Sequence, residues 1–372
     1  MRPTWAEVNL TALAENVAKV KDYIGPDVLL NCVVKGDAYG HGARQIAAAA
    51  LNGGADSLSV ATIEEAAELR SSGICGPILV LGFVPPKDAW QVARENLTAT
   101  VFLPEQAQAL QAAAARAGKT IKIHLKLDTG MSRIGIAGSD QDVLFAKSLK
   151  TYENLEFEGL FSHFSLAETE NPSLALQQLH KFEIFSDQLK ILGACPPVLH
   201  MANTAAIFRF KESHFNMVRL GVGMYGSMPA SIIEDPLDLR PVMTLKTSIV
   251  YIKEVEKGRA ISYDGTWIAP KDSLIGTLPI GYADGLSRSF GNKAQVWVRG
   301  TLVPVVGRVC MDQTMIDLSQ VPQAQSGDEV IIFGESQPKR STLMLAEEVG
   351  EIPHQITAVI SKRVPRFYNN LK

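Results

Sequence analysis

The sequence predicts an α/β protein with an N-terminal (β/α)8 barrel of the TIM type, followed by a mainly β C-terminal domain. Short apolar segments alternate with amphipathic helical segments about eight times over roughly the first 225 residues, which fits a barrel better than an open doubly wound sheet. Beyond about residue 236 the pattern changes to successive strand-like runs. A length of 372 residues also suggests about two domains.

The first helix and strand illustrate the repeating unit. Apolar residues recur at helical spacing from Leu10 to Ile24, and the run 28–34 (VLLNCVV) is apolar without strict alternation, as expected for a parallel strand covered on both faces. Further candidate strands are 57–61, 78–81, 98–102, 121–127, 155–162, 198–201 and 217–220. Candidate helices between them include 62–72, 104–117 and 174–192. Thr62 and Glu65 predict a capping box at the start of the first of these.

The C-terminal part reads as a separate domain. Its strand-like runs are 243–255, 273–283, 294–307 and 328–334, with a single helical stretch near 342–349. We therefore expect a barrel over residues 1–235 and a β domain over 236–372. Residues 1–9, which precede the first helix, are a candidate to pair with the second domain.

Composition indicates a cytoplasmic protein whose ligand is a small molecule. With 36 basic and 39 acidic residues the net charge is −3, which offers no field to attract nucleic acid or an anionic membrane. The four cysteines lack ligand-like spacing, which argues against structural zinc and against a disulfide framework. Neither a signal peptide nor a membrane-spanning apolar run is apparent, so we expect a soluble, unexported protein.

In a barrel of this type the active site lies at the C-terminal ends of the strands. Lys35 follows an apolar strand, where partial desolvation lowers a lysine's pKa and favours the free amine that a Schiff base requires. The alternative is a lysine that extends from a strand end into solvent. Polar residues also follow later strands, namely Asp128 to Arg133, His163, His200 to Thr204 and Arg219 to Gly223.

The loops after the last two strands are suited to a phosphate. Asn203, Thr204 and the amides of Gly221 to Gly223 supply neutral donors, although Asn203 and Thr204 could equally cap a helix. Arg219 needs a partner for its charge and could form a structural ion pair. His163 could be a buried core histidine. Because these positions contain no paired histidines, we expect no metal site.

Nine segments of the chain resemble, in order, the signature segments of bacterial alanine racemases. They are VVKGDAYGHG, LDTGMSRIGI, GLFSHF, HMANTAA, VRLGVGMYG, ISYDGTW, PIGYADG, GRVCMDQTM and ISKRVPR. The resemblance implies an enzyme dependent on pyridoxal 5′-phosphate (PLP), with an N-terminal barrel, a C-terminal β domain and a head-to-tail homodimer whose active sites draw on both subunits. Such an enzyme interconverts L- and D-alanine and supplies D-alanine for cell-wall peptidoglycan.

The resemblance also implies residue roles. Lys35 is similar to the lysine that bears the cofactor and serves as one catalytic base, and Tyr263 to the opposing base from the other subunit. The implied cofactor-binding residues are Tyr39, His163, Asn203, Thr204, Arg219, Gly221, Val222 and His354, with Arg219 facing the pyridine nitrogen and His163 linking it to the tyrosine. The implied substrate-binding residues are Arg133, Tyr282 and Met311, supported by Lys126, Cys310 and Asp312. Lys126 matches a lysine that is carbamylated in some members.

The chain departs from the family pattern near its C-terminus, where His354 stands in place of the usual tyrosine. This change could admit a larger or polar side chain, so a serine or broad-specificity racemase is an alternative; otherwise His354 replaces one hydrogen bond to the phosphate. A decarboxylase of basic amino acids is disfavoured by the tyrosine-bearing ISYDG and CMDQ strings. A non-enzymatic PLP carrier is disfavoured by the C-terminal domain.

Overall fold

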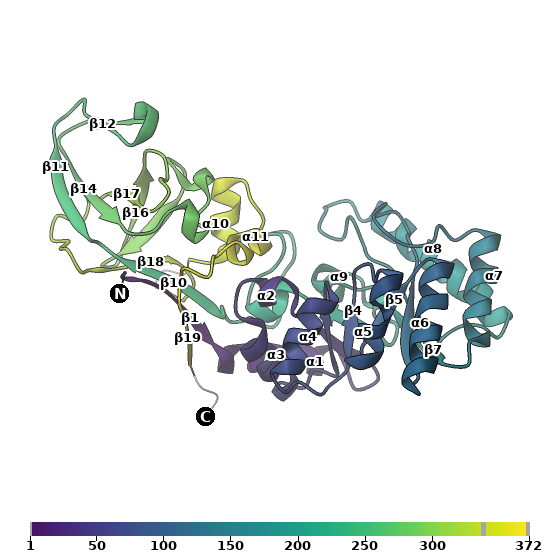
Figure 1. Cartoon of the computed structure of the whole chain (residues 1–372). Coiled ribbons are helices and arrows are strands. Elements are labelled where there is room, and N and C mark those ends of the chain that lie inside the picture. The colour runs from purple at the N-terminus through teal and green to yellow at the C-terminus, as the bar shows by residue number, and fades with distance from the viewer. Residues whose placement is uncertain (1, 336–339, 370–372) are drawn as a thin grey trace.

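The computed structural model describes residues 2–335 and 340–369 and shows two lobes (Figure 1). Within these residues the N-terminal lobe is a closed barrel of parallel strands in sequence order, which confirms the predicted fold class. The barrel strands are β2 (Leu29–Val33), β3 (Ser57–Val60), β4 (Ile78–Val80), β5 (Thr98–Val101), β6 (Ile121–Lys126), β7 (Leu155–Phe161), β8 (Val198–His200) and β9 (Met217–Leu220). Every expected barrel strand is therefore present.

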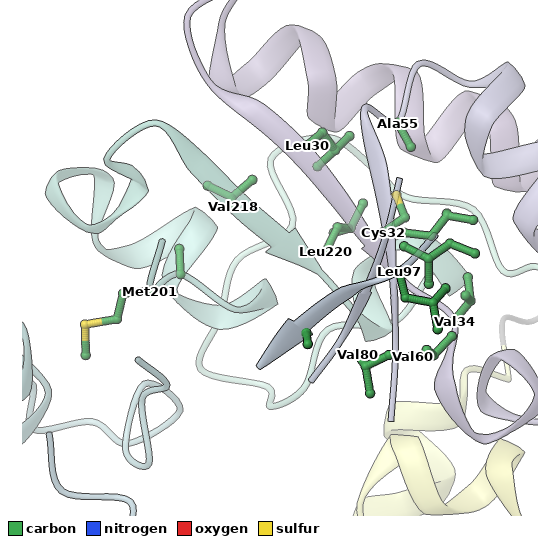
Figure 2. Packing of buried hydrophobic residues seen from close by; sticks show 14 of the residues in the cluster. Leu30, Cys32, Val34, Ala55, Val60, Val80, Leu97, Met201, Val218 and Leu220 are labelled. Atoms are coloured by element: carbon green, nitrogen blue, oxygen red, sulfur yellow. The ribbon is translucent and has the colours of Figure 1, made fainter. Parts of the chain in front are cut away.

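Helices surround the barrel and bury its outer face. They are α1 (Leu10–Ile24), the short turn α2 (Lys35–Tyr39), α3 (Ala43–Asn52), α4 (Ile63–Ser71), α5 (Ala89–Arg94), α6 (Pro104–Ala117), α7 (Asp140–Ser148), α8 (Ser173–Ile191) and α9 (Thr204–Arg209). Thr62 and Glu65 form the predicted capping box on α4. Leu30 and Cys32 of β2 lie in the apolar cluster (Figure 2), so the alternate residue Asn31 faces the barrel interior.

The C-terminal lobe is a mainly antiparallel sheet. In the described part of the chain its strand order is β11-β14-β17-β16-β15-β18-β10-β1-β19, with a separate β12-β13 pair. The strands are β1 (Thr4–Asn9), β10 (Met243–Ser248), β11 (Tyr251–Val255), β12 (Ala260–Ile261), β13 (Trp267–Ile268), β14 (Ser273–Leu278), β15 (Gln295–Val298), β16 (Thr301–Val306), β17 (Thr314–Asp317), β18 (Glu329–Phe333) and β19 (Arg366–Asn369). Because β1 pairs with β10 and β19, strands near both ends of the chain lie in this sheet (Figure 1).

The expectation of a single C-terminal helix is wrong. Helix α10 (Thr342–Val349) lies where it was predicted, but a second helix, α11 (Pro353–Ala358), follows it and packs against α2. Six residues are too few to show a helical period in sequence, and the helix depends on burying Pro353 and Ile356. Since α11 carries His354, it brings a residue of the C-terminal part to the mouth of the barrel. No helix among residues 2–335 and 340–369 is both long and apolar enough to cross a membrane.

Candidate active site

A cavity of about 750 Å³ opens at the C-terminal ends of the barrel strands. All the site residues that were predicted from the barrel line it, and α11 adds one more side chain from the C-terminal part. These residues are Lys35, Tyr39, Lys126, Arg133, His163, Asn203, Thr204, Arg219, Gly221, Val222 and His354. Loops that are far apart in sequence therefore meet around one space large enough for a small-molecule ligand.

Lys35 enters the cavity from a strained turn. Residues 36–39 all adopt left-handed backbone angles, with φ between 52° and 63°, although only Gly36 tolerates them without cost. Glu65 accepts a hydrogen bond from the amide of Gly36 at 2.7 Å and helps to hold the turn. Burial and the positive charge of Arg133 lower the pKa of Lys35, while Glu65 opposes the shift. The amine is thereby moved toward its uncharged, nucleophilic form.

The loops after β8 and β9 carry a compact set of uncharged hydrogen-bond donors and acceptors, which line the same cavity as Lys35. The hydroxyl of Thr204 accepts hydrogen bonds from the amides of Gly221 (3.0 Å) and Gly223 (3.4 Å). A Cβ atom on Gly221 would lie 3.3 Å from the hydroxyl of Tyr39, so glycine leaves room there for this close approach. Burial raises the pKa of Tyr39 to about 12, which keeps its phenol protonated as a donor.

Asn203 and His354 complete this wall in different ways. Asn203 caps α9, because its side-chain oxygen accepts from the amide of Ala206 at 3.1 Å. His354 has a buried Nδ1 with no hydrogen-bond partner among the described residues, and its ring lies 5.8 Å from that of Tyr39. Burial and the charge of Lys35 lower the pKa of His354 to about 4, so the imidazole is neutral. An unsatisfied buried nitrogen of this kind indicates a missing ligand partner.

Arg219 is a buried cation that faces the cavity beside His163. Its Nη2 donates to the carbonyl of Ser162 (2.8 Å) and lies 3.2 Å from Nδ1 of His163. Burial lowers the pKa of Arg219 to about 9, which still leaves the guanidinium charged at neutral pH. Burial, and next the charge of Arg219, lower the pKa of His163 well below its usual value. His163 is therefore a neutral imidazole that accepts at Nδ1 and keeps its Nε2–H free to donate.

Lys126 and Arg133 lie on the same rim. The Lys126 ammonium nitrogen lies 4.5 Å from the centre of the Phe161 ring. Burial, followed by the charges of Arg219 and Arg133, lowers the pKa of Lys126 well below its ordinary value. Among the described residues Arg133 has no hydrogen-bonded or ionic partner. The charges of Arg133 and of nearby Arg219 make this side of the cavity suited to an anionic ligand.

The remaining predicted site residues lie elsewhere, in turns and loops of the C-terminal lobe. Tyr263 is 68% exposed and follows Ser262, a residue with φ of 65°. Met311 and Cys310 border the same surface depression as Tyr263, and the carbonyl of Cys310 accepts from the amide of Tyr282 at 3.0 Å.

This second group does not line the cavity within one chain. Asp312 pairs with Arg363 at 2.7 Å on the same exposed surface. Strand β12, which directly precedes Tyr263, lies at the end of the C-terminal lobe that is remote from the barrel (Figure 1). The structure therefore brings together the barrel residues with His354, and separately Tyr263, Tyr282 and residues 310–312, but it does not bring the two groups together.

Several polar residues of the barrel interior were missed by the sequence interpretation. His124 and Glu158 form hydrogen bonds that reach Arg219 through His200, and Glu65 lines the cavity. A signal was present, because polar residues occupy alternate positions 122, 124 and 126 of an otherwise apolar strand. Such alternation places them on one face of the strand.

Comparisons with known proteins identify the family of the chain. The family models described as the N-terminal and C-terminal domains of alanine racemase match residues 8–229 and 242–368. Alanine racemase 2 of Caldanaerobacter subterraneus is 45% identical over 372 residues, which cover 99% of this chain and 95% of that protein. The alanine racemase of Desulfovibrio desulfuricans is 42% identical over 367 residues, covering 99% and 98%.

Solved structures give the same answer. The alanine racemase of Clostridium difficile 630 has a TM-score of 0.93 and 36% identity, covering 99% of this chain and 96% of that one. The enzyme of Streptomyces lavendulae, a D-cycloserine producer, has a TM-score of 0.94 and 33% identity, covering 100% and 98%. These matches span both lobes and confirm the resemblance found in the sequence. The chain belongs to the alanine racemase family.

Proposed function

We propose that this protein is a PLP-dependent alanine racemase that interconverts L- and D-alanine and supplies D-alanine for cell-wall peptidoglycan in the cytoplasm. The observation that carries the proposal is a lysine of lowered pKa, Lys35, entering the same cavity as a neutral polar cradle and a buried arginine. Family membership over both lobes supports the same activity.

The residues present fit PLP. The hydroxyls of Tyr39 and Thr204 and the unsatisfied nitrogen of His354 are uncharged groups that suit a phosphate, and Gly221 leaves space beside them. Arg219 would face the pyridine nitrogen, and Lys35 would carry the cofactor. When bound, PLP acts as an electron sink that makes the Cα–H bond of an amino acid acidic. Arg133, which lacks a protein partner among the described residues, would bind the substrate carboxylate.

Racemisation needs one base on each face of the substrate Cα. Lys35 is one candidate, because its lowered pKa provides an amine able to accept a proton. Tyr263 cannot be the second base within the same chain, since it lies on the remote end of the C-terminal lobe. We therefore infer a head-to-tail homodimer in which Tyr263 of the partner subunit faces Lys35. The substrate entrance would be lined by the residues that lie near this tyrosine, namely Tyr282, Met311, Cys310 and Asp312.

His163 and Arg219 would support the tyrosine. A phenol is a weak base at neutral pH, so its anion needs stabilisation. Neutral His163 has its Nε2–H available to donate to that anion, and its Nδ1 accepts from the charged Arg219. Arg219 also gives up its own proton reluctantly, so a ring nitrogen opposite it stays unprotonated. That limits the electron sink and favours rapid return of the proton to Cα.

The first experiment is to purify the protein, record the visible absorbance of bound PLP before and after borohydride, and assay racemisation of L-alanine by chiral chromatography. Tyr263→Phe should retain the bound cofactor and lose racemisation by about 10²- to 10⁴-fold, the range typical of a removed general base. Lys35→Ala should lose both. A colourless, inactive wild-type protein in the presence of added PLP would refute the proposal.

One observation favours a second candidate function, racemisation of serine. The buried, unpartnered Nδ1 of His354 could accept a hydrogen bond from a substrate hydroxyl that alanine lacks. A preference for L-serine in the same assay would support this alternative.

A further inference from the structure

A chain of buried polar groups runs from the cavity into the barrel interior. Nη1 of Arg219 lies 2.7 Å from Nδ1 of His200, and Nε2 of His200 lies 2.8 Å from Nδ1 of His124. Nε2 of His124 lies 3.0 Å from a carboxylate oxygen of Glu158. Both imidazoles are buried, whereas Glu158 is partly exposed and also accepts from Lys122 at 2.5 Å. We call Arg219, His200, His124 and Glu158 the relay.

The hydrogen bonds of the relay can have only one direction. A guanidinium has no acceptor, so His200 must accept at Nδ1 and carry its proton on Nε2. His124 then accepts at Nδ1 and donates its own Nε2–H to Glu158, which can only accept when ionised. Every donor points away from Arg219 and toward the carboxylate. This arrangement fixes one neutral tautomer for each histidine.

The backbone around His124 is built to accommodate the relay. In the β6–β7 ladder Ile123 pairs with Phe157, but His124 pairs with Gly159, so Glu158 is the extra residue of a β-bulge. Bulges re-aim a side chain that the regular ladder would direct elsewhere. A Cβ atom on Gly159 would lie 2.5–2.6 Å from the His124 ring, so only glycine leaves space for the imidazole.

Arg219 needs a distant anion because it has none nearby. Its direct partners are the two histidines and backbone carbonyls, and no carboxylate contacts it among residues 2–335 and 340–369. Burial raises the pKa of Glu158, but the hydrogen bonds from His124 and Lys122 outweigh this and hold it at about 2. The end of the relay is therefore negatively charged throughout the physiological range.

We propose that Glu158 and His124 are positioning residues for Arg219: they fix the tautomer of His200 and supply, through it, the negative charge that balances the buried guanidinium. The inference rests on the proposed function, because its consequence is felt at the cofactor. Negative charge passed along hydrogen bonds in a low-dielectric interior strengthens the charged state of the arginine. Arg219 thereby keeps its proton and holds a fixed orientation toward the ring nitrogen.

Glu158→Gln tests the charge, since the amide oxygen can still accept from His124. Glu156→Gln is the control, because Glu156 also forms an ion pair with Lys122, at 3.9 Å, without reaching His124. In the PLP-loaded enzyme we expect E158Q to shift the absorption maximum of the cofactor and to lower kcat by about three- to tenfold with little change in KM. E156Q should leave both unchanged. If the two variants behave alike, the proposal is wrong.

Two further measurements separate positioning from general stability. ¹⁵N NMR of the imidazoles should show His200 and His124 as neutral tautomers protonated at Nε2, in the enzyme with or without PLP; protonation of His200 at Nδ1 would overturn the relay. His124→Phe should lower kcat at least as much as E158Q, and adding E158Q to it should cause no further loss. An additive loss would contradict the relay. If the wild-type enzyme neither binds PLP nor racemises alanine, the proposed function is refuted. The tautomers of His200 and His124 test the relay independently of that result.

Discussion

His354 combines a buried, neutral imidazole with an unsatisfied Nδ1 at the wall of the cavity. We expect His354→Tyr to raise the ratio of kcat/KM for alanine to that for serine by about tenfold, because a bulkier ring reduces the space for a hydroxymethyl group and removes the imidazole acceptor. Racemisation of both amino acids by the two enzymes measures this ratio. His180→Tyr, at an exposed histidine of α8, is the control. An unchanged ratio with weakened PLP binding would confine His354 to the phosphate.

Lys126 is a buried lysine whose pKa is lowered well below its ordinary value by burial and by the neighbouring arginines. An uncharged amine adds CO₂ to form a carbamate and releases one proton, and the resulting anion would balance Arg219 and Arg133. We expect a carbamate signal in ¹³C NMR after incubation with ¹³C-bicarbonate, and its loss in Lys126→Ala. Lys122→Ala should retain the signal, since hydrogen bonding to Glu158 raises the pKa of Lys122. A signal that survives in Lys126→Ala would contradict the assignment.

At the residue scale, sequence could identify groups next to strand ends but not groups within strands. Lys35, His163 and Arg219 were found because a barrel presents strand ends at one face. His124 and Glu158 were missed because their contact depends on a bulge and on space left by Gly159, neither of which a single sequence displays. The role of Asn203 could not be assigned from sequence either, because the sequence was compatible with both a helix cap and a ligand contact. In the structure its side chain caps α9.

At the element scale, the contact between α2 and α11 joins the lysine-bearing turn to the C-terminal part. Gly40 ends α2 with φ of 81°, and a Cβ atom there would overlap the carbonyl oxygen of Thr357 in α11. Arg366 of β19 donates to the carbonyl of Gly40 at 3.0 Å and 3.1 Å. The turn is thus held from two elements of the C-terminal part.

Gly40→Ala should destabilise the protein by about 2 to 4 kcal/mol, the sum of left-handed strain and a backbone clash. We also expect weaker PLP binding, because α2 places Lys35 and Tyr39. Gly118→Ala is the matched control: it is also left-handed, with φ of 61° and ψ of 35°, but nothing lies within 4 Å of the added methyl, so it should cost only about 1 kcal/mol. Urea midpoints and PLP titrations of both variants provide the comparison. Equal effects would mean that the contact with α11 is unimportant.

Elements differed in how well sequence could predict them. The barrel strands were found because buried parallel strands are continuous apolar runs. Helix α11 was missed because Pro353–Ala358 is too short to show a period and is stabilised by its contacts. The boundary between the domains at residues 235 and 236 stays a prediction, and the pairing of β1 with β10 shows that the chain enters the sheet before it enters the barrel.

At the scale of the whole molecule, the proposed site would be divided between two parts of the chain, neither of them complete alone. Lys35 lines the cavity, whereas Tyr263 lies beside Met311 on a surface depression of the C-terminal lobe. Tyr263 is 68% exposed, and the preceding Ser262 has a left-handed backbone. Strained turns cluster at functional positions, so the exposed Tyr263 beside Met311 supports a contact between copies.

Subunit complementation tests this arrangement directly. Lys35→Ala and Tyr263→Phe should each be inactive as homodimers. In a mixed dimer one site contains both substitutions, while the other combines Lys35 of one subunit with Tyr263 of its partner and is intact. If equal amounts of the two variants exchange at random, half of the dimers are mixed, and each mixed dimer has one intact site of two. In a closed two-fold dimer, about a quarter of the wild-type activity should therefore return. Chiral chromatography after refolding the mixture measures the recovery, with each variant refolded alone as control. If mixing restores nothing while co-purification of two differently tagged variants shows mixed dimers, both bases belong to one chain and the shared site is wrong.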